Sequence, residues 1–232
     1  MYWPPFITGR LIKRYKRFLA DVQLDNGSTV TAHCPNSGSM TNCSEPGRKV
    51  YLSQHNNPKR KLPYTWELID MGSSLVGVNT LVPNRLVAEA VSAKAIAELK
   101  DFDTIQSEVK VSSHSRLDLK LEKASLPPCY VEIKNCTLVE EGRALFPDAV
   151  TARGRKHLEE LQILAKSGNR CVMFFLIQRM DAKSFSPADD IDPAYGNALR
   201  QAFAHGVELL AYDVVIDFKQ IHVNRRLPIH LE

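Results

Sequence analysis

Residues 115–135 constrain the fold of this chain more than any other stretch, and their sequence is SRLDLKLEKASLPPCYVEIKN. Leucines alternate with charged residues before a Ser-Leu-Pro-Pro turn, and a second alternating segment follows it. Such alternation is typical of strands that bury one face. If the turn is centred near Ser125, the two strands pair antiparallel with Asp118 opposite Glu132. The sequence therefore predicts a β-hairpin that holds two carboxylates on one face of a sheet.

Lys134 shares this face with Glu132, because side chains two residues apart in a strand lie on the same side. Two carboxylates repel each other, so a cation is the natural third partner. Mg²⁺ or Mn²⁺ would take oxygen ligands and keep open positions for water and phosphate oxygens. An aspartate followed by Glu-x-Lys on the next strand resembles the active site of the PD-(D/E)XK nuclease fold. On that resemblance, the metal ligands would be Asp118, Glu132 and the Ile133 carbonyl, and Lys134 would orient a water molecule.

The same spacing has a simpler explanation. Asp118 and Glu132 could be exposed strand residues that pair with Lys120 and Lys134, since Glu-x-Lys is common on solvated sheet faces. The spacing alone leaves both interpretations open, so the rest of the sequence has to distinguish a metal site from a charged surface.

The segment before the hairpin is predicted to be a helix from residue 85 to about residue 99, with Asn84 as its N-cap. Glu89 lies at the border of the apolar stripe of this helix, where most residues belong to the solvated rim. If the helix packs on the face that carries Asp118 and Glu132, Glu89 would be a third carboxylate at the metal and a catalytic residue.

Residues 85–232 are predicted to form an α/β layer fold around a mixed sheet, because helical and strand patterns alternate along them. A continuous apolar run over residues 171–177 indicates a buried parallel strand. The other elements predicted after the hairpin are a helix from Asp148 or Thr151 to about Lys166, a loop at 184–193, a helix at 192–205 and a final strand at 207–216.

Residues 1–84 are predicted to form a small β-barrel. About five short strands are separated by turn signals, of which Asp25-Asn26-Gly27 is a strong hairpin turn. An OB-fold is the leading candidate for so many short strands in about seventy residues. Trp66 is expected inside this barrel, because large aromatic side chains in small barrels usually pack there.

Positive charge is concentrated in the same segment: residues 1–84 carry ten Lys and Arg against five Asp and Glu, and the remainder carries twenty against twenty-one. A basic β domain favours a polyanionic partner, and cations interleaved with aromatic residues are typical of single-strand binding. A solvated rim would give the same pattern. The candidate DNA-binding residues are Lys13, Arg14, Lys16, Arg17, Lys59, Arg60 and Lys61, together with Arg153 and Lys156, which share the charged side of the second predicted helix with His157 and Glu160.

Composition argues against several other classes of protein. The five cysteines are odd in number and form no CxxC pair, which argues against a disulfide framework and against a zinc site. No segment has the apolar core of a signal peptide or the length of a membrane span, so a soluble cytoplasmic protein is expected. An apolar content of 44% and a charged content of 24% are ordinary for a globular core.

Eight segments resemble the bacterial sugar fermentation stimulation protein A family: RYKRFLADV, HCPNSGSM, GVNT-x-x-PN-x-LV, SEVKV, SRLD, YVEIKN, FPDAVTARGRKHL and GVELLAYD. The likeness runs from about Arg10 to about Asp213. It implies an OB-like domain at residues 1–84 and a PD-(D/E)XK nuclease-like domain at residues 85–232, in a DNA-binding protein linked to the regulation of sugar metabolism, notably that of maltose. The nuclease motif would fall on Asp118, Glu132 and Lys134, with Glu89 as the helix carboxylate, although Leu117 stands where the superfamily name has proline.

Three functions follow as hypotheses. The first is a DNA-binding regulator, without sequence specificity, on a nuclease-like scaffold whose metal site is intact. The second is an active Mg²⁺-dependent deoxyribonuclease, since a pure binder has no need of the metal-site residues. The third is a small-molecule sensor, which no Gly-rich phosphate loop supports. The sequence indicates no protein partner and leaves the oligomeric state open.

Overall fold

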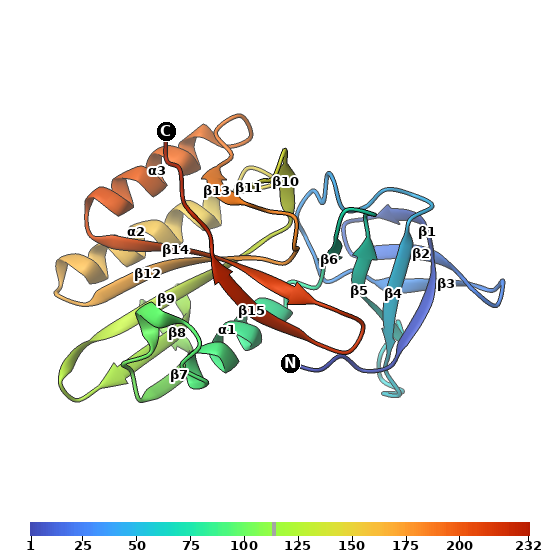
Figure 1. The fold of residues 1–232 in the computed structure, drawn as a ribbon, viewed down its shortest axis with the longest axis horizontal. Coiled ribbons are helices and arrows are strands. Elements are labelled where there is room, and N and C mark those ends of the chain that lie inside the picture. Colours follow the sequence, from blue (N-terminus) through green and yellow to red (C-terminus); the bar gives the residue numbers. More distant parts are fainter. Residues whose placement is uncertain (113–114) are drawn as a thin grey trace.

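The computed structural model describes residues 1–112 and 115–232, which form a β-barrel beside a larger layered α/β unit (Figure 1). Within this described part, no helix is long and apolar enough to cross a membrane. The N-terminus lies near the α/β unit, because the backbone of Met1 accepts a hydrogen bond from Ile221 and Tyr2 bridges to Gln220.

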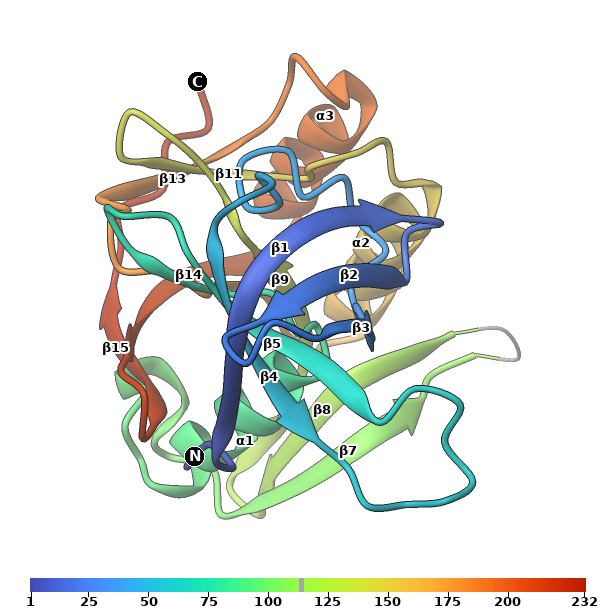
Figure 2. The same cartoon turned by 90° about the vertical axis from the view of Figure 1, so that its right-hand side faces the viewer.

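The barrel closes because its third strand pairs with two others. Sheet order is β3-β2-β1-β4-β5-β6, and β3 also pairs in parallel with β5 (Figure 2). Trp66 is fully buried inside, and its indole N–H donates to the Leu68 carbonyl at 2.9 Å. The predicted OB-like barrel is therefore confirmed, as is the turn at Gly27, whose φ is +86°. Its strands are β1 (Phe6–Tyr15), β2 (Leu19–Leu24), β3 (Thr29–His33), β4 (Lys49–Gln54), β5 (Tyr64–Asp70) and β6 (Leu75–Gly77).

The second unit is built on a mixed six-stranded sheet, as predicted. Its order is β15-β14-β12-β9-β8-β7, in which β12 runs parallel to both β9 and β14 while the other pairs are antiparallel. The strands are β7 (Thr104–Lys110), β8 (Arg116–Lys123), β9 (Leu126–Cys136), β12 (Arg170–Ile177), β14 (Val207–Ile216) and β15 (Ile221–Arg226).

Helices cover both faces of this sheet, which explains the continuous apolar run of β12. Val172, Phe174 and Leu176 pack in the core beneath α1 (Val82–Ser92), whereas Met173 and Phe175 pack in the core beneath α2 (Ala152–Lys166) and α3 (Pro193–Ala204). Figure 1 shows α2 and α3 together on one side of the sheet and α1 on the other. The remaining elements are the 3₁₀ turn η1 (Ala97–Leu99) and a small sheet of β10 (Leu138–Glu140), β11 (Arg143–Phe146) and β13 (Ser184–Pro187).

The first helix differs from its prediction at both ends. It begins at Val82, because Pro83 lacks an N–H and fits the first turn of a helix. Because the helix begins there, Asn84 lies inside its first turn and does not cap it. The helix ends at Ser92, well before the predicted end at about residue 99. The N-caps of α2 and α3 are confirmed: the Thr151 hydroxyl accepts from the Gly154 N–H, and the Asp192 carboxylate accepts from the Tyr195 N–H.

Three strands differ from the sequence predictions. β1 was not predicted, because its exposed positions carry Lys and Arg and only Gly9 and Leu11 of its ten residues are buried. β14 is not the last strand, since β15 follows it and pairs antiparallel. β13 lies in a segment expected to be a loop and pairs in parallel with β11.

Candidate functional site

The β8–β9 hairpin is joined by a two-residue turn, Ala124 and Ser125. The turn is centred near Ser125 as expected, but the Leu-Pro-Pro segment predicted to belong to it begins strand β9. Leu119 lies opposite Val131, and continuing this antiparallel register by one residue places Asp118 opposite Glu132. One carboxylate oxygen of Asp118 accepts the Ile133 N–H at 2.7 Å. The hairpin therefore brings the two acidic residues together on β8 and β9.

The other carboxylate oxygen of Asp118 accepts a hydrogen bond from the side-chain amide of Asn84 at 2.6 Å. Burial raises the pKa of Asp118, and the charge of Glu132 raises it further, from 3.8 to about 6. The Ile133 N–H, Lys134 and Asn84 oppose this rise. A cation at Asp118 would favour the ionised carboxylate and so lower this pKa.

Glu132 is almost completely buried, with 3% of its side chain exposed. Its Oε1 accepts a hydrogen bond from Lys134 Nζ at 2.5 Å and contacts Nδ1 of His157. Burial raises the pKa of Glu132, but His157 and Lys134 outweigh it, so that the pKa is lowered overall. Its Oε2 is also buried and has no hydrogen-bond partner among the described residues. A buried carboxylate oxygen left unpaired in this way is costly unless a ligand satisfies it.

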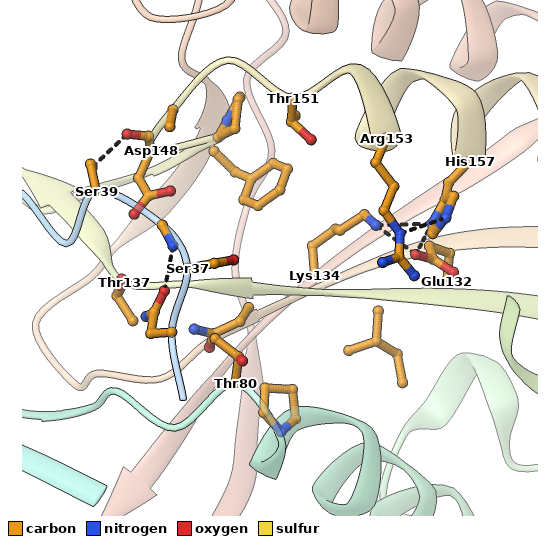
Figure 3. A pocket seen from close by; sticks show the side chains of 18 of the residues that line it. Ser37, Ser39, Thr80, Glu132, Lys134, Thr137, Asp148, Thr151, Arg153 and His157 are labelled. Atoms are coloured by element: carbon orange, nitrogen blue, oxygen red, sulfur yellow. Dashed lines mark hydrogen bonds and ion pairs between the residues drawn. The ribbon is translucent and has the colours of Figure 1, made fainter. Parts of the chain in front are cut away.

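These groups line a pocket of about 640 Å³ between the barrel and the α/β unit. Its walls are the barrel loop at residues 36–39, the start of α1, strand β9 and the segment at residues 146–151. Figure 3 shows Glu132, Lys134, Arg153 and His157 gathered at one end of the pocket. Hydroxyl groups from both parts of the chain gather at the other end, near Asp148: those of Ser37, Ser39 and Thr137.

The barrel wall of this pocket is held in place by Asp148. Its carboxylate accepts the Met40 N–H at 3.0 Å, and its backbone carbonyl accepts the Ser39 hydroxyl at 2.6 Å. Gly38 leaves room for this contact, because a Cβ there would lie 2.5 Å from the Asp148 carboxylate. Arg14 fixes the same loop by donating to the carbonyls of Asn36, Gly38 and Ser39.

Four of the residues predicted to form the metal site line the pocket: Asp118, Glu132, Ile133 and Lys134. Glu89 does not join them. Its carboxylate pairs with Arg85 at 2.9 Å and with the N-terminal ammonium at 3.2 Å. Glu89 nevertheless borders a neighbouring hollow that also includes Asp118.

The structure separates the predicted basic residues into two groups. Arg14, Arg17 and Arg153 line the pocket, and Lys156 borders an adjoining hollow. The others do not line it: Lys13 pairs with Asp21 at 3.8 Å, Arg60 donates to the Thr65 hydroxyl at 2.9 Å, and Lys16, Lys59 and Lys61 are exposed.

Two site residues were missed by the sequence predictions. Asn84 was assigned as a helix cap, and His157 was placed on a charged helix side. Both are held to the site by side-chain hydrogen bonds, Asn84 to Asp118 and His157 to Glu132. Arg153 lies one helical turn from His157 and donates to its Nε2 at 3.4 Å. The spacing of Arg153 and His157 was visible in the sequence, but the packing of α2 against β9 was not.

The donor set fits a hard divalent cation. Carboxylate and carbonyl oxygens suit Mg²⁺, Mn²⁺ and Ca²⁺, and the unpaired Oε2 of Glu132 is a free ligand atom. Among the described residues, however, no group of three or more His, Cys, Asp and Glu side chains is arranged to hold a metal. Two carboxylates and a backbone carbonyl leave several coordination positions for water or phosphate oxygens.

Comparison with known proteins covers both parts of the chain. Residues 12–78 match the family model "SfsA N-terminal OB domain", and residues 81–220 match "Sugar fermentation stimulation protein RE domain". A sugar fermentation stimulation protein homolog of Pelobacter propionicus is 54% identical over 231 residues, covering 100% of both chains. A homolog of Geobacter sulfurreducens is 52% identical over 225 residues, covering 97% of this chain and 96% of the relative.

One solved structure also resembles the whole chain. It is Pyrococcus furiosus SfsA in complex with Ca²⁺, with a TM-score of 0.90 and 24% sequence identity. The match covers 99% of this chain and 98% of that chain, so the arrangement of the barrel beside the α/β unit is common to both.

Proposed function

Since this chain belongs to the sugar fermentation stimulation protein family, with an OB domain followed by a restriction-endonuclease-like domain, we propose that it binds DNA in the pocket between the two. On this proposal the domains are residues 1–84 and 85–232, binding has no strong sequence preference, and a divalent cation is held beside the DNA. Regulation of sugar metabolism, including that of maltose, would act through this binding.

The observation that carries the proposal is the convergence of cations from both domains on a carboxylate pair. Arg17 comes from the β1–β2 turn of the barrel and Arg153 from the first turn of α2, yet both line one pocket with Asp118 and Glu132. Arginines bind phosphate oxygens well, because the planar guanidinium donates several hydrogen bonds. Carboxylates beside them would repel phosphate unless a metal ion lies between.

A divalent cation at this place is supported by the unpaired Oε2 of Glu132 and by the raised pKa of Asp118. The related Pyrococcus furiosus protein is described in complex with Ca²⁺. The ion would be held by Asp118, Glu132 and the Ile133 carbonyl. These oxygen ligands suit Mg²⁺ and Mn²⁺ as well as Ca²⁺. His157 and Asn84 would orient the two carboxylates, because hydrogen bonds behind metal ligands set their direction.

DNA binding is tested by fluorescence anisotropy with labelled DNA in Ca²⁺. Arg17→Ala and Arg153→Ala should each weaken binding to all sequences alike and flatten its dependence on salt, since each removes one phosphate contact. Lys59→Ala is the matched control, because Lys59 is exposed on the barrel but does not line the pocket. Equal losses in all three variants would mean that the pocket is not the binding surface.

A second candidate is phosphodiester hydrolysis, and the position of Lys134 favours it. Its ammonium lies 2.5 Å from Glu132 Oε1 and 3.2 Å from His157 Nδ1, with only 13% of the side chain exposed. A bound divalent cation would lower the pKa of a water ligand and polarise the phosphate. Lys134 would offset the negative charge that develops on the phosphate oxygens. A protein that only binds DNA has no evident need of this ammonium.

Cleavage is tested by incubating plasmid and single-stranded DNA with Mg²⁺, Mn²⁺ or EDTA. An active enzyme should degrade DNA only with a metal ion, and Lys134→Ala should abolish cleavage while metal binding persists. Metal and DNA binding without any cleavage would leave the regulator as the function and exclude the nuclease.

A further inference from the structure

Three hollows meet at the carboxylate pair. The pocket shares Asn84 and Asp118 with a hollow along α1, named here the α1 hollow. It shares Arg153 and His157 with a hollow between the start of β8 and α2, named here the β8–α2 hollow. An elongated ligand could therefore leave the pocket in two directions, one on each side of the site.

The two exits carry opposite charge. Among the described residues, the β8–α2 hollow is bordered by Arg116, Arg153 and Lys156, all exposed, and by no carboxylate. The α1 hollow is bordered by Glu89 and Glu108, besides Asp118, and Arg85 there already pairs with Glu89. A polyanion that crosses the pocket is thus attracted to the first exit and repelled from the second.

Three of the six unpaired buried side-chain atoms of the described residues lie along the same route. These three are Nε of Arg14, Oε2 of Glu132 and Oγ of Ser115; the others belong to Trp3, Gln178 and Tyr195, which line neither the pocket nor the β8–α2 hollow. Arg14 and Glu132 line the pocket, and Ser115 borders the β8–α2 hollow. Buried polar groups are normally satisfied, so a row of unsatisfied ones indicates where a polar ligand binds.

The volume of the pocket indicates whether a single strand or a duplex fits inside it. A volume of about 640 Å³ is that of a pocket for a small organic ligand, which matches one or two nucleotides and not a segment of duplex. The barrel loop that forms one wall is tied down by Asp148 and by three bonds from Arg14, so it does not act as a movable flap. Val150, 71% exposed at the lip of the pocket, offers an apolar surface for an unstacked base.

We propose that the pocket and the β8–α2 hollow form a continuous path for a single strand of DNA, which enters beside Arg17, passes Asp118 and Glu132, and leaves over Arg116, Ser115 and Lys156. This path rests on the proposed DNA binding. It adds that the DNA is a single strand and that the strand leaves the pocket through the β8–α2 hollow. On this path the Ser37 hydroxyl faces a sugar or a base edge, while Arg17, Arg116 and Arg153 face phosphates.

The test compares a labelled oligonucleotide with the same oligonucleotide annealed to its complement, by anisotropy in Ca²⁺. The single strand should bind at least about tenfold more tightly, a difference well above the error of such titrations. Arg116→Ala should weaken single-strand binding several-fold and reduce the salt slope by about 0.7, the value for one lost phosphate contact on a single strand. Lys156→Ala should do the same.

Arg85→Ala is the matched control, because Arg85 is exposed, as Arg116 and Lys156 are, but lies in the α1 hollow. It should leave single-strand affinity unchanged. Duplex binding as tight as single-strand binding would overturn the path while leaving DNA binding intact, and so would unchanged single-strand affinity in both Arg116→Ala and Lys156→Ala. Absence of binding to either DNA would overturn the proposed function itself.

Discussion

Replacing Asp118 with asparagine should stabilise the metal-free protein at neutral pH. Asp118 takes up a proton more readily in the folded chain than in the unfolded chain, because burial and Glu132 raise its pKa from 3.8 to about 6. The folded state is therefore favoured at low pH, and this advantage is lost as the pH rises from about 4 through about 6. Asparagine has nearly the same shape and no charge, so it should be free of this loss.

The expected size follows from the two pKa values. A difference of one pKa unit corresponds to about 1.4 kcal/mol, so ionised Asp118 lowers the free energy of unfolding by up to about 3 kcal/mol above pH 6. Asparagine can still accept the Ile133 N–H and, if the Asn84 amide turns over, bond to Asn84. Most of the 3 kcal/mol should therefore appear as added stability in Asp118→Asn.

Urea unfolding in EDTA across this pH range measures the effect. Wild type should lose stability relative to Asp118→Asn as the pH rises, whereas the exposed Glu159→Gln on α2 should follow wild type. A cation at a thousandfold excess over its Kd should reverse the order, because binding at that excess stabilises wild type by about 4.1 kcal/mol. If Asp118→Asn is no more stable than wild type in EDTA above pH 6, the electrostatic account of this site is wrong.

Two further variants probe the surroundings of the carboxylates. His157→Gln should lower Mn²⁺ affinity at least about tenfold, because His157 orients the metal ligand Glu132. Calorimetry measures this affinity, and an unchanged value would mean that His157 only packs against the site. Gly38→Ala should lower the free energy of unfolding by about 1–3 kcal/mol, since its Cβ would lie 2.5 Å from the Asp148 carboxylate and the loop would have to move. Ser37→Ala in the same loop is the control for Gly38→Ala, and equal thermal midpoints for both would show that the loop is not held as described.

The site could be predicted from the sequence where it depends on local pattern. Strand alternation and a turn centred near Ser125 are enough to place Asp118 across from Glu132, because the hairpin register follows from the position of the turn. The apolar run of β12 likewise indicates a strand covered on both faces. The closed barrel follows from many short strands in few residues.

What the sequence did not reveal depends on contacts between distant segments. Asn84 and His157 lie 34 and 25 residues from their carboxylate partners, and no local pattern encodes such pairings. Glu89 was expected at the metal on the condition that its helix packs on the face of Asp118 and Glu132; in the structure its carboxylate pairs with Arg85 and the N-terminus. Arg14 was expected to contact phosphate, yet much of its guanidinium is engaged by loop carbonyls.

Calorimetric titration of Mn²⁺ tests most directly the claim that Asp118 and Glu132 form a divalent-metal site. Wild type should bind one ion, and Glu132→Gln should bind none, because it loses the charge of the unpaired buried oxygen. Glu89→Gln should bind like wild type, since the Glu89 carboxylate pairs with Arg85 and the N-terminus. No heat of binding in wild type, or equal binding in Glu132→Gln, would show that the carboxylate pair is not a metal site.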